Sequence, residues 1–429
     1  MLRALSHRNY RLFFAGQSVS LIGTWMQQTA MAWLVYRLTG SAWWLGVISF
    51  ASQIPAFIAS PLSGVLTDRW NKHRALIITQ TLAMLQALAV AALALSGLIQ
   101  MWHLIVLGIV LGVISAFDMT IRQAFLTQMV TQREDLANAI ALNSSMVNAT
   151  RLIGPSLAGV LIALTNEGVC FLLNGISYIA VIVALLLMRV APLPPQVHPP
   201  LLRGLLEGFR YSFGFAPIRA VILLLGTVSL VGLPYAVLLP IVVVDTLHGG
   251  PATLGVLSAA SGVGALAGAL YMTARKTVLG LGLRIAIMPL LFGAALIVFA
   301  YSRSLTLALA MLLIMGFAMM VHMAASNTIL QTISDEDKRG RVMSFYTMAF
   351  MGMTPLGNLA AGALASARLG ASGTMALGGA VCILAAVIFA GELERLREQV
   401  RPIYRKMGIL PEVATGIQAA TEMRVPPEH

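Results

Sequence analysis

Two stretches of the chain, GVLTDRWNKHRAL at residues 64–76 and GALYMTARKTVLG at residues 268–280, align with each other at an offset of 204 residues. The identical pairs are Gly64 with Gly268, Leu66 with Leu270 and Lys72 with Lys276. A fixed offset of this size indicates that the chain consists of two halves with a common fold, which is the build of many membrane proteins with internal repeats.

A second pair of stretches supports the same offset. DMTIRQAFL at residues 118–126 lies over HMAASNTIL at residues 322–330, so that Asp118 and His322 occupy equivalent positions in the two halves. Substrates of transporters built from two such halves are bound at the interface of the repeats, near the middle of the membrane. We therefore expect both residues to lie close to a central pathway.

The composition places the chain in a membrane. Of its 429 residues 58% are hydrophobic and only 10% are charged, whereas soluble domains carry about 25% charged residues. Apolar stretches near the length needed to span about 30 Å of hydrocarbon recur along the whole chain. We predict an all-α membrane protein with twelve transmembrane helices, at residues 11–37, 43–66, 75–97, 102–126, 139–164, 169–189, 218–245, 252–273, 283–301, 305–331, 342–366 and 370–391.

The long connection between the sixth and seventh helices divides the chain. It opens with five prolines between Pro192 and Pro200 and continues as a basic amphipathic stretch, residues 201–215. Proline-rich segments act as semi-rigid spacers, and a basic amphipathic helix can lie on a membrane surface. The predicted parts are an N-terminal six-helix bundle (1–190), a cytoplasmic linker with an amphipathic helix (191–217), a C-terminal six-helix bundle (218–392) and a cytoplasmic tail (393–429).

The net charge of +12 follows from membrane topology. With both termini in the cytoplasm, the outer loops hold only Arg37, Arg303 and Arg368, and nearly all other Lys and Arg residues fall on the inner side. This asymmetry is the positive-inside rule. It predicts a multi-pass protein of a bacterial inner membrane surrounded by lipid, and it removes the reason to expect nucleic acid as a partner.

The loop after the second predicted helix resembles the signature loop of the major facilitator superfamily, with Asn71 at a position where glycine is usual. The resemblance implies two six-helix bundles, a monomer, and a latch that closes the inner gate. The residues that match the latch are Gly64, Asp68, Arg69, Lys72 and Arg74, with Arg122 as a partner for Asp68 at the inner end of the fourth helix. The alternative is that these charges only fix topology.

Residues 23–46 and 115–163 resemble the branch of that superfamily that includes the enterobactin exporter and related efflux proteins. Thr120 stands where this branch usually has proline. Gly154, Pro155 and Gly159 partly match the Gly-Pro motif of exporters. Such a pair kinks a helix and provides a smooth face for close packing, and the resemblance implies export.

Three ionisable residues fall inside predicted spans. Asp118, Arg151 and His322 are candidates for coupling transport to protons, because ionisable groups within a membrane are costly and usually functional. We expect Asp118 and Arg151 to form a pair that protonation releases. The alternatives are a permanent buried ion pair for Asp118 and Arg151, contact with an anionic substrate for Arg151, and simple packing for His322.

The candidates for a substrate cavity are amides and aromatic side chains at similar depth, namely Gln27, Gln28, Trp33, Tyr235 and Asn327. Amides combined with aromatic faces suit a bulky, partly apolar ligand that forms hydrogen bonds. The alternative for each of them is helix packing or contact with lipid. The predicted cavity carries no strong charge.

The sequence as a whole favours a secondary transporter that exports a siderophore or an amphipathic drug-like small molecule by proton antiport with alternating access. An importer of the same fold, for a siderophore or nutrient, is the alternative. No nucleotide-binding motif, catalytic cluster, cofactor motif or metal spacing is present, and Cys170 and Cys382 are isolated. A membrane enzyme or a non-transporting receptor is therefore disfavoured.

Overall fold

The computed structural model describes residues 3–67, 70–130, 132–189, 209–275 and 277–409. Within these ranges the chain is helical and contains no strand, as predicted. The helices of the first half are α1 (Arg8–Thr39), α2 (Ala42–Thr67), α3 (Lys72–Leu95), α4 (Met101–Met129), α5 (Leu136–Leu164) and α6 (Glu167–Leu186). Those of the second half are α8 (Ala216–Val231), α9 (Tyr235–Ile241), α10 (Pro251–Thr273), α11 (Leu281–Tyr301), α12 (Leu305–Ile333), α13 (Arg339–Thr347), α14 (Met353–Ser366) and α15 (Gly370–Lys406).

These helices account for the twelve predicted spans. Eleven helical segments of the described chain are long and apolar enough to cross a membrane. The remaining span is α1, whose 32 residues are more than sufficient in length but include many amide and hydroxyl side chains. A polar helix of this kind is stable in a membrane only where other helices or an aqueous pathway cover its polar groups.

Two predicted spans are interrupted. The span at 218–245 breaks after Val231, and the chain resumes as α9 behind Pro234 and ends in a π-helical turn, Val242–Thr246. Pro234 lacks the backbone N–H that a continuous helix needs. The span at 342–366 contains a second π-helical turn, Met348–Gly352, between α13 and α14. Single π turns inside helices are frequent at functional sites.

The last helix is longer than predicted. Residues 393–406 belong to α15 rather than to a separate tail. Leu393, Leu396 and Val400 are buried there, at a spacing that places them on one side of the helix. They belong to the same buried apolar cluster as Val221 of α8 and Ile285 of α11. The region 410–429 and most of the predicted linker lie outside the described residues.

The described end of the linker is helical and docks on the second bundle. Residues 209–214 form a helix in which Phe209 and Phe213 contact Phe345 of α13, with ring centroids 6.0 Å apart in each pair. The Tyr211 hydroxyl accepts a hydrogen bond from the backbone N–H of Asp335 at 3.1 Å. Burial raises the pKa of this phenol, which stays protonated and uncharged at neutral pH.

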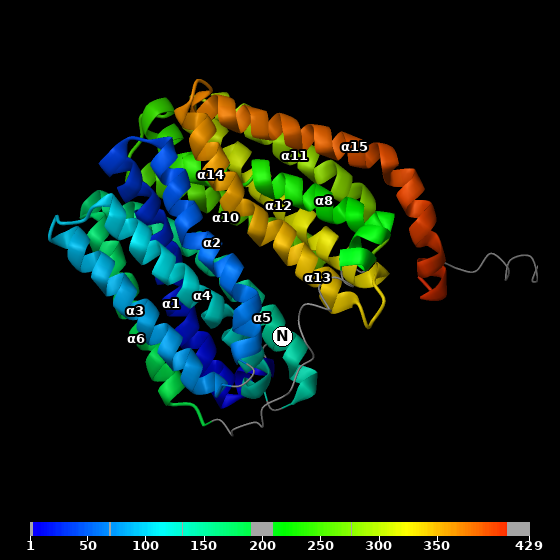
Figure 1. Ribbon diagram of the computed structural model, residues 1–429, viewed down its shortest axis with the longest axis horizontal. Helices are drawn as coiled ribbons and strands as arrows, with labels where there is room; N and C mark the ends of the chain where they lie inside the picture. The colour runs from blue at the N-terminus through cyan, green and yellow to red at the C-terminus, as the bar shows by residue number, and fades with distance from the viewer. Residues whose placement is uncertain (1–2, 68–69, 131, 190–208, 276, 410–429) are drawn as a thin grey trace, which may run out of the picture.

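The two bundles converge at one end of the molecule and diverge toward the other, which carries the N-terminus (Figure 1). Two glycine crossings join them at the convergent end. A Cβ on Gly159 of α5 would lie 2.8 Å from the Cα of Gly255 of α10. On the other side, a Cβ on Gly362 of α14 would lie 2.9 Å from the Cα of Gly46 of α2. Only glycine permits helices to approach this closely.

Polar contacts reinforce the same end. The Tyr36 hydroxyl, near the end of α1, donates to Asp245 Oδ1 of the second bundle at 2.6 Å. Asn358 Nδ2 of α14 donates to Ser49 Oγ of α2 at 2.8 Å. Trp33 packs against apolar clusters of both bundles. The convergent end is thus closed by backbone contacts, hydrogen bonds and an aromatic side chain together.

Candidate functional site

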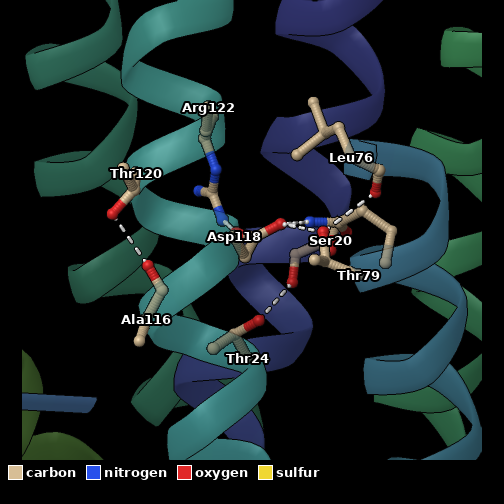
Figure 2. Close-up of polar contacts among 9 residues, drawn as sticks. Ser20, Thr24, Leu76, Thr79, Ala116, Asp118, Thr120 and Arg122 are labelled. Atoms are coloured by element: carbon tan, nitrogen blue, oxygen red, sulfur yellow. Dashed lines mark hydrogen bonds and ion pairs between the residues drawn. The ribbon is translucent and has the colours of Figure 1, made fainter. Parts of the chain in front are cut away.

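Asp118 lies in the middle of a hydrogen-bond network between α3 and α4 (Figure 2). Its side chain is 9% exposed. Oδ1 accepts from Thr79 Oγ1 at 3.0 Å and from Gln80 Nε2 at 2.5 Å, and Oδ2 forms an ion pair with Arg122, one turn further along α4. A buried carboxylate needs such partners to compensate for lost hydration. The network therefore fixes α3 against α4.

This network corrects one sequence-based expectation. Asp118 pairs with Arg122 and not with Arg151, since residues 118 and 122 lie on one face of the same helix. The predicted partner of Arg122 in the latch was Asp68, and Asp68 and Arg69 lie outside the described residues. In the described chain the Arg122 guanidinium is thus engaged by the membrane-embedded acid.

The remaining latch residues begin the third helix. Gly64 belongs to α2, and Lys72 is the first residue of α3, followed by Arg74. Asn71 is the N-cap of α3, and its side chain accepts a hydrogen bond from the backbone N–H of Arg74 at 3.0 Å. Asn71 stands where the signature loop usually has glycine, and its side chain satisfies one of the free N–H groups at the start of a helix.

Replacement of this cap gives a first testable expectation. We expect Asn71→Ala to destabilise the protein by about 1 kcal/mol and Asn71→Gly by only a few tenths, because glycine is a tolerated N-cap. Thermal unfolding of the purified protein in one detergent measures the difference. Equal losses for the two variants would contradict a capping role. Ser96→Ala, at the other end of the same helix, serves as the control.

Thr120, which occupies the position of a proline in the exporter branch, keeps α4 unbroken. Its hydroxyl donates to the backbone carbonyl of Ala116 at 2.9 Å, and it lies 2.7 Å from Ser63 Oγ of α2. A proline at this position would kink the helix. Threonine leaves the helix unbroken and adds a hydrogen bond to the neighbouring helix.

His322 is buried within the second bundle, contrary to the expectation that it faces a central pathway. The residue is 1% exposed, and neither ring nitrogen has a hydrogen-bond partner. The ring lies beside the backbone of Ile285 in α11. Asp118 likewise faces α3, the equivalent helix of the first bundle. The repeat thus places both residues against the same neighbour, inside their own bundles.

The amides of α1 lie on different sides of the helix. Gln27 Oε1 accepts from Asn174 Nδ2 of α6 at 2.6 Å, and Gly16 and Gly23 on the same side also contact α6. Gln27 thus contributes to helix packing, which removes it from the set of cavity candidates. Gln28 is exposed and lies on the side of α1 that carries Tyr36, which contacts the second bundle.

The other cavity candidates also differ in whether their side chains remain accessible. Tyr235 is 8% exposed, and its hydroxyl lies 3.0 Å from Ser261 Oγ inside the second bundle, so it too is a packing residue. Asn327 is partly exposed on α12 and accepts from Gln331 Nε2 at 2.6 Å. Trp33 bridges the two bundles at the closed end. The candidates that retain access are therefore Gln28 and Asn327.

Arg151 is exposed, although it lies in the middle of α5. Its guanidinium carbon is 5.6 Å from the centroid of the Trp25 ring on α1, in a cation–π arrangement. The sequence-based interpretation did not include Trp25 in the site. The signal that was available is its spacing: Trp25 precedes Gln28 by three residues, which places the two on one face of α1.

The Gly-Pro segment of α5 packs in two directions. A Cβ on Gly154 would lie 2.5 Å from the Trp25 Cβ of α1. Pro155 presents its carbonyl oxygen to Gly255 of α10, and Gly159 meets the same residue. One short segment therefore brings α5 into close contact with its own bundle and with the other bundle at the same time.

A helical membrane chain with two six-helix bundles, joined at one end by close helix crossings, is a transporter of the major facilitator type. The chain belongs to the transmembrane secretion effector family of this superfamily, whose profile matches residues 1–406. The sequence-based resemblance to the branch of siderophore and drug exporters is confirmed by the relatives that follow. Among the described residues no group of three His, Cys, Asp or Glu side chains is arranged to hold a metal ion.

Three relatives of known role are similar over most of their length. The staphyloferrin A transporter of Staphylococcus aureus is 25% identical over 353 residues, which are 81% of this chain and 87% of the relative. The multidrug efflux pump Tap of Mycolicibacterium fortuitum is 27% identical, covering 82% and 86%. The enterobactin exporter EntS of Citrobacter koseri is 25% identical, covering 92% and 94%.

Solved structures share the fold at low sequence identity. A bacterial homologue of the iron transporter ferroportin, crystallised in an inward-facing state, has a TM-score of 0.68 at 18% identity and covers 90% of this chain and 98% of its own. The nucleoside transporter NupG has a TM-score of 0.68 at 12% identity, with coverage of 90% and 99%. These similarities establish the fold and leave the substrate open.

Proposed function

We propose that this transporter exports an amphipathic small molecule, of the siderophore or drug-like class, across a bacterial inner membrane in exchange for protons. The proposal places both termini in the cytoplasm, as the positive-inside rule indicates. The closed end is then the outer end, and the divergence of the bundles in Figure 1 corresponds to an inward-open state. Export requires cytoplasmic access in this state.

The observation that carries the proposal is the packing of the Gly-Pro segment of α5. Gly154 contacts α1, and Gly159 contacts α10 of the other bundle. Because glycine has no side chain, the two helices approach backbone to backbone at this crossing, and such close packing favours a tight seal. A pump that works against a gradient needs such a seal, since a leak would dissipate the gradient. EntS and Tap, both named as exporters, are consistent with this direction.

Asp118 is the group that we assign to proton exchange. Its carboxylate is the one acidic side chain of the described chain that is buried deep within a span and bonded to a cation on the same helix. Protonation would remove the attraction to Arg122 and weaken the connection from α4 to α3 through Thr79 and Gln80. A proton would thereby change how one bundle is held together, which is the link that antiport requires.

Inside-out membrane vesicles, energised to be acid inside, test the function. A catecholate siderophore or a cationic drug added outside should release protons from the lumen, as monitored by a pH-sensitive dye. Asp118→Asn should abolish the release. The matched control is Glu167→Gln, because Glu167 is also buried and paired, with Arg37 at 2.8 Å, but lies at the opposite end of the first bundle. Folding of each variant is checked by size-exclusion chromatography.

The outcomes separate the proposal from its rival. Proton release that occurs only when the substrate is preloaded in the lumen would identify an importer and refute export. Release that persists in folded Asp118→Asn would keep antiport and exclude Asp118 as the exchange site. In that case His322→Ala is the next variant, because His322 is the other buried ionisable group of the repeat.

A further inference from the structure

The orientation of α5 determines what Arg151 faces. Ile153, Leu157 and Val160 are exposed apolar residues on one side of the helix, the side that suits lipid. Arg151 lies on the opposite side, because it precedes these residues by two, six and nine positions and each position turns the helix by about 100°. The exposure of Arg151 is therefore exposure to the space between the bundles.

The neighbours of Arg151 confirm this direction. Leu152 contacts Gly262 of α10, in the second bundle, with its Cα 3.1 Å from a Cβ placed on that glycine. Gly154 contacts α1 on the other flank. Arg151 thus points into the angle between α1 and α10, where the two bundles face each other near the middle of α5. A long cation in this place can reach a solute between the bundles.

No acid neutralises this cation in the described chain. The ion pairs of the described residues engage Arg122, Arg37 and other cations, and none includes Arg151. Asp118, the buried acid of the same bundle, is fully occupied by Thr79, Gln80 and Arg122. Among the described residues, the positive charge of Arg151 thus has no acidic partner, which differs from the predicted cavity without strong charge.

Trp25 gives this charge a flat apolar partner. The guanidinium carbon lies over the indole ring, 5.6 Å from its centroid. A planar ligand can stack either on the guanidinium plane or on the indole face. Gln28, three residues on and exposed on the same side of α1, adds an amide that can donate or accept hydrogen bonds. Cation, aromatic face and amide thus converge from α1 and α5.

From this arrangement we infer that Arg151, Trp25 and Gln28 form a binding site for planar aromatic anions. The ligand class is an aromatic or conjugated carboxylate or catecholate, whose negative charge pairs with Arg151 while its ring stacks on Trp25. The inference rests on the proposed function and narrows it, because it selects anionic substrates over cationic amphipathic drugs. It also assigns Arg151 to substrate binding and not to proton exchange.

Two dyes with a common xanthene ring and opposite charge, anionic fluorescein and cationic rhodamine 6G, test the selectivity. Fluorescence polarisation is measured with the purified protein in lipid nanodiscs, with empty nanodiscs as background. The wild type should bind fluorescein more tightly. Arg151→Gln should weaken fluorescein binding by about tenfold or more, in the range expected for loss of a charge-assisted contact, and leave rhodamine 6G unchanged or tighter.

Further variants separate charge from shape. Arg151→Lys should recover part of the fluorescein affinity, because it keeps the charge and loses the planar guanidinium. Trp25→Leu should weaken the binding of both dyes. Arg303→Gln, which removes an exposed cation between α11 and α12, is the matched control and should behave as the wild type. Equal binding of both dyes by wild type, or fluorescein binding unaffected by Arg151→Gln, would overturn the inference.

Competition identifies the source of the anion. Displacement of fluorescein by a catecholate siderophore would support a siderophore as substrate, and displacement only by an aromatic carboxylate drug would support a drug-like anion. The assay needs no proton gradient. Anion binding that depends on Arg151 without proton-linked flux would refute the proposed function and keep this site. Proton-linked export of catecholates that is unaffected by Arg151→Gln would refute the site and keep the function.

Discussion

Gly255→Leu is expected to reduce transport strongly by hindering closure of the end at which the bundles converge. A Cβ at residue 255 would lie 2.7 Å from the carbonyl oxygen of Pro155 and 2.9 Å from the Cα of Gly159. Both atoms are backbone of the other bundle, so no side chain can move aside. A crowded contact of this kind costs about 1–3 kcal/mol, which shifts a two-state equilibrium roughly five- to 150-fold.

The shift can be measured directly as a distance between the bundles. Spin labels at Leu98→Cys and Arg303→Cys report on exposed turns that follow α3 and α11. Native Cys170 and Cys382 are buried and do not compete for labelling. We expect Gly255→Leu to lengthen this distance and to reduce transport by roughly five- to 150-fold. Unchanged distances and transport would show that the crossing does not limit closure.

Gly391→Leu is the matched control for this experiment. Gly391 also lies within a helix, but a Cβ placed on it meets no atom within 4 Å. The same side chain is therefore added without a clash. We expect normal distances and normal transport in this variant. Its helix should be no less stable, because leucine favours a helix over glycine by up to about 1 kcal/mol.

Asp118→Ala is expected to be the most destabilising single substitution in the first bundle. Removal of the carboxylate leaves Arg122 without its ionic partner and Gln80 Nε2 without its acceptor, while the Thr79 hydroxyl keeps only the backbone carbonyl of Leu76 as acceptor. Loss of one member of a buried ion pair costs about 3–5 kcal/mol. We expect a clear fall in the unfolding midpoint of the purified protein under fixed detergent conditions.

A double variant separates the ion pair from other effects of the substitution. Asp118→Ala combined with Arg122→Ala removes both charges, so we expect it to be more stable than Asp118→Ala alone. Asp337→Ala removes an exposed acid in the loop before α13 and should change stability by less than about 0.5 kcal/mol. A double variant that is less stable than Asp118→Ala would show that the unpaired Arg122 is not the main cost.

The architecture could be predicted from the sequence because two signals agree. The offset of 204 residues predicts two similar halves, and the lengths of the apolar stretches predict how many helices each half contains. The breaks were not predictable in the same way. The stretch between Arg219 and Asp245 is strongly apolar on both sides of the break, so hydropathy does not reveal that the helix stops after Val231. The π-helical turn at Met348–Gly352 also leaves the apolar pattern intact.

The site was predictable in some of its residues, since Trp25 was missed, and its pairings were not predictable. Asp118, Arg151 and Gln28 stood out because polar groups are costly in a span. Their partners depend on how each helix is rotated about its axis, and an apolar helix with almost equal hydropathy on all sides gives no measure of that rotation. The expected pair of Asp118 and Arg151 was wrong for this reason. The pair of Asp118 and Arg122 needed only the spacing of four residues on one helix.

The length of α15 has a consequence for how the chain ends. Its 37 residues correspond to roughly 55 Å at 1.5 Å per residue, against about 30 Å of hydrocarbon. The surplus shares a buried apolar cluster with α8 and α11 through Leu393, Leu396 and Val400. Shortening the chain at residue 392 would uncover this apolar surface and invite aggregation. Residues 393–406 are thus a built-in cover for the second bundle, and an affinity tag belongs beyond Lys406.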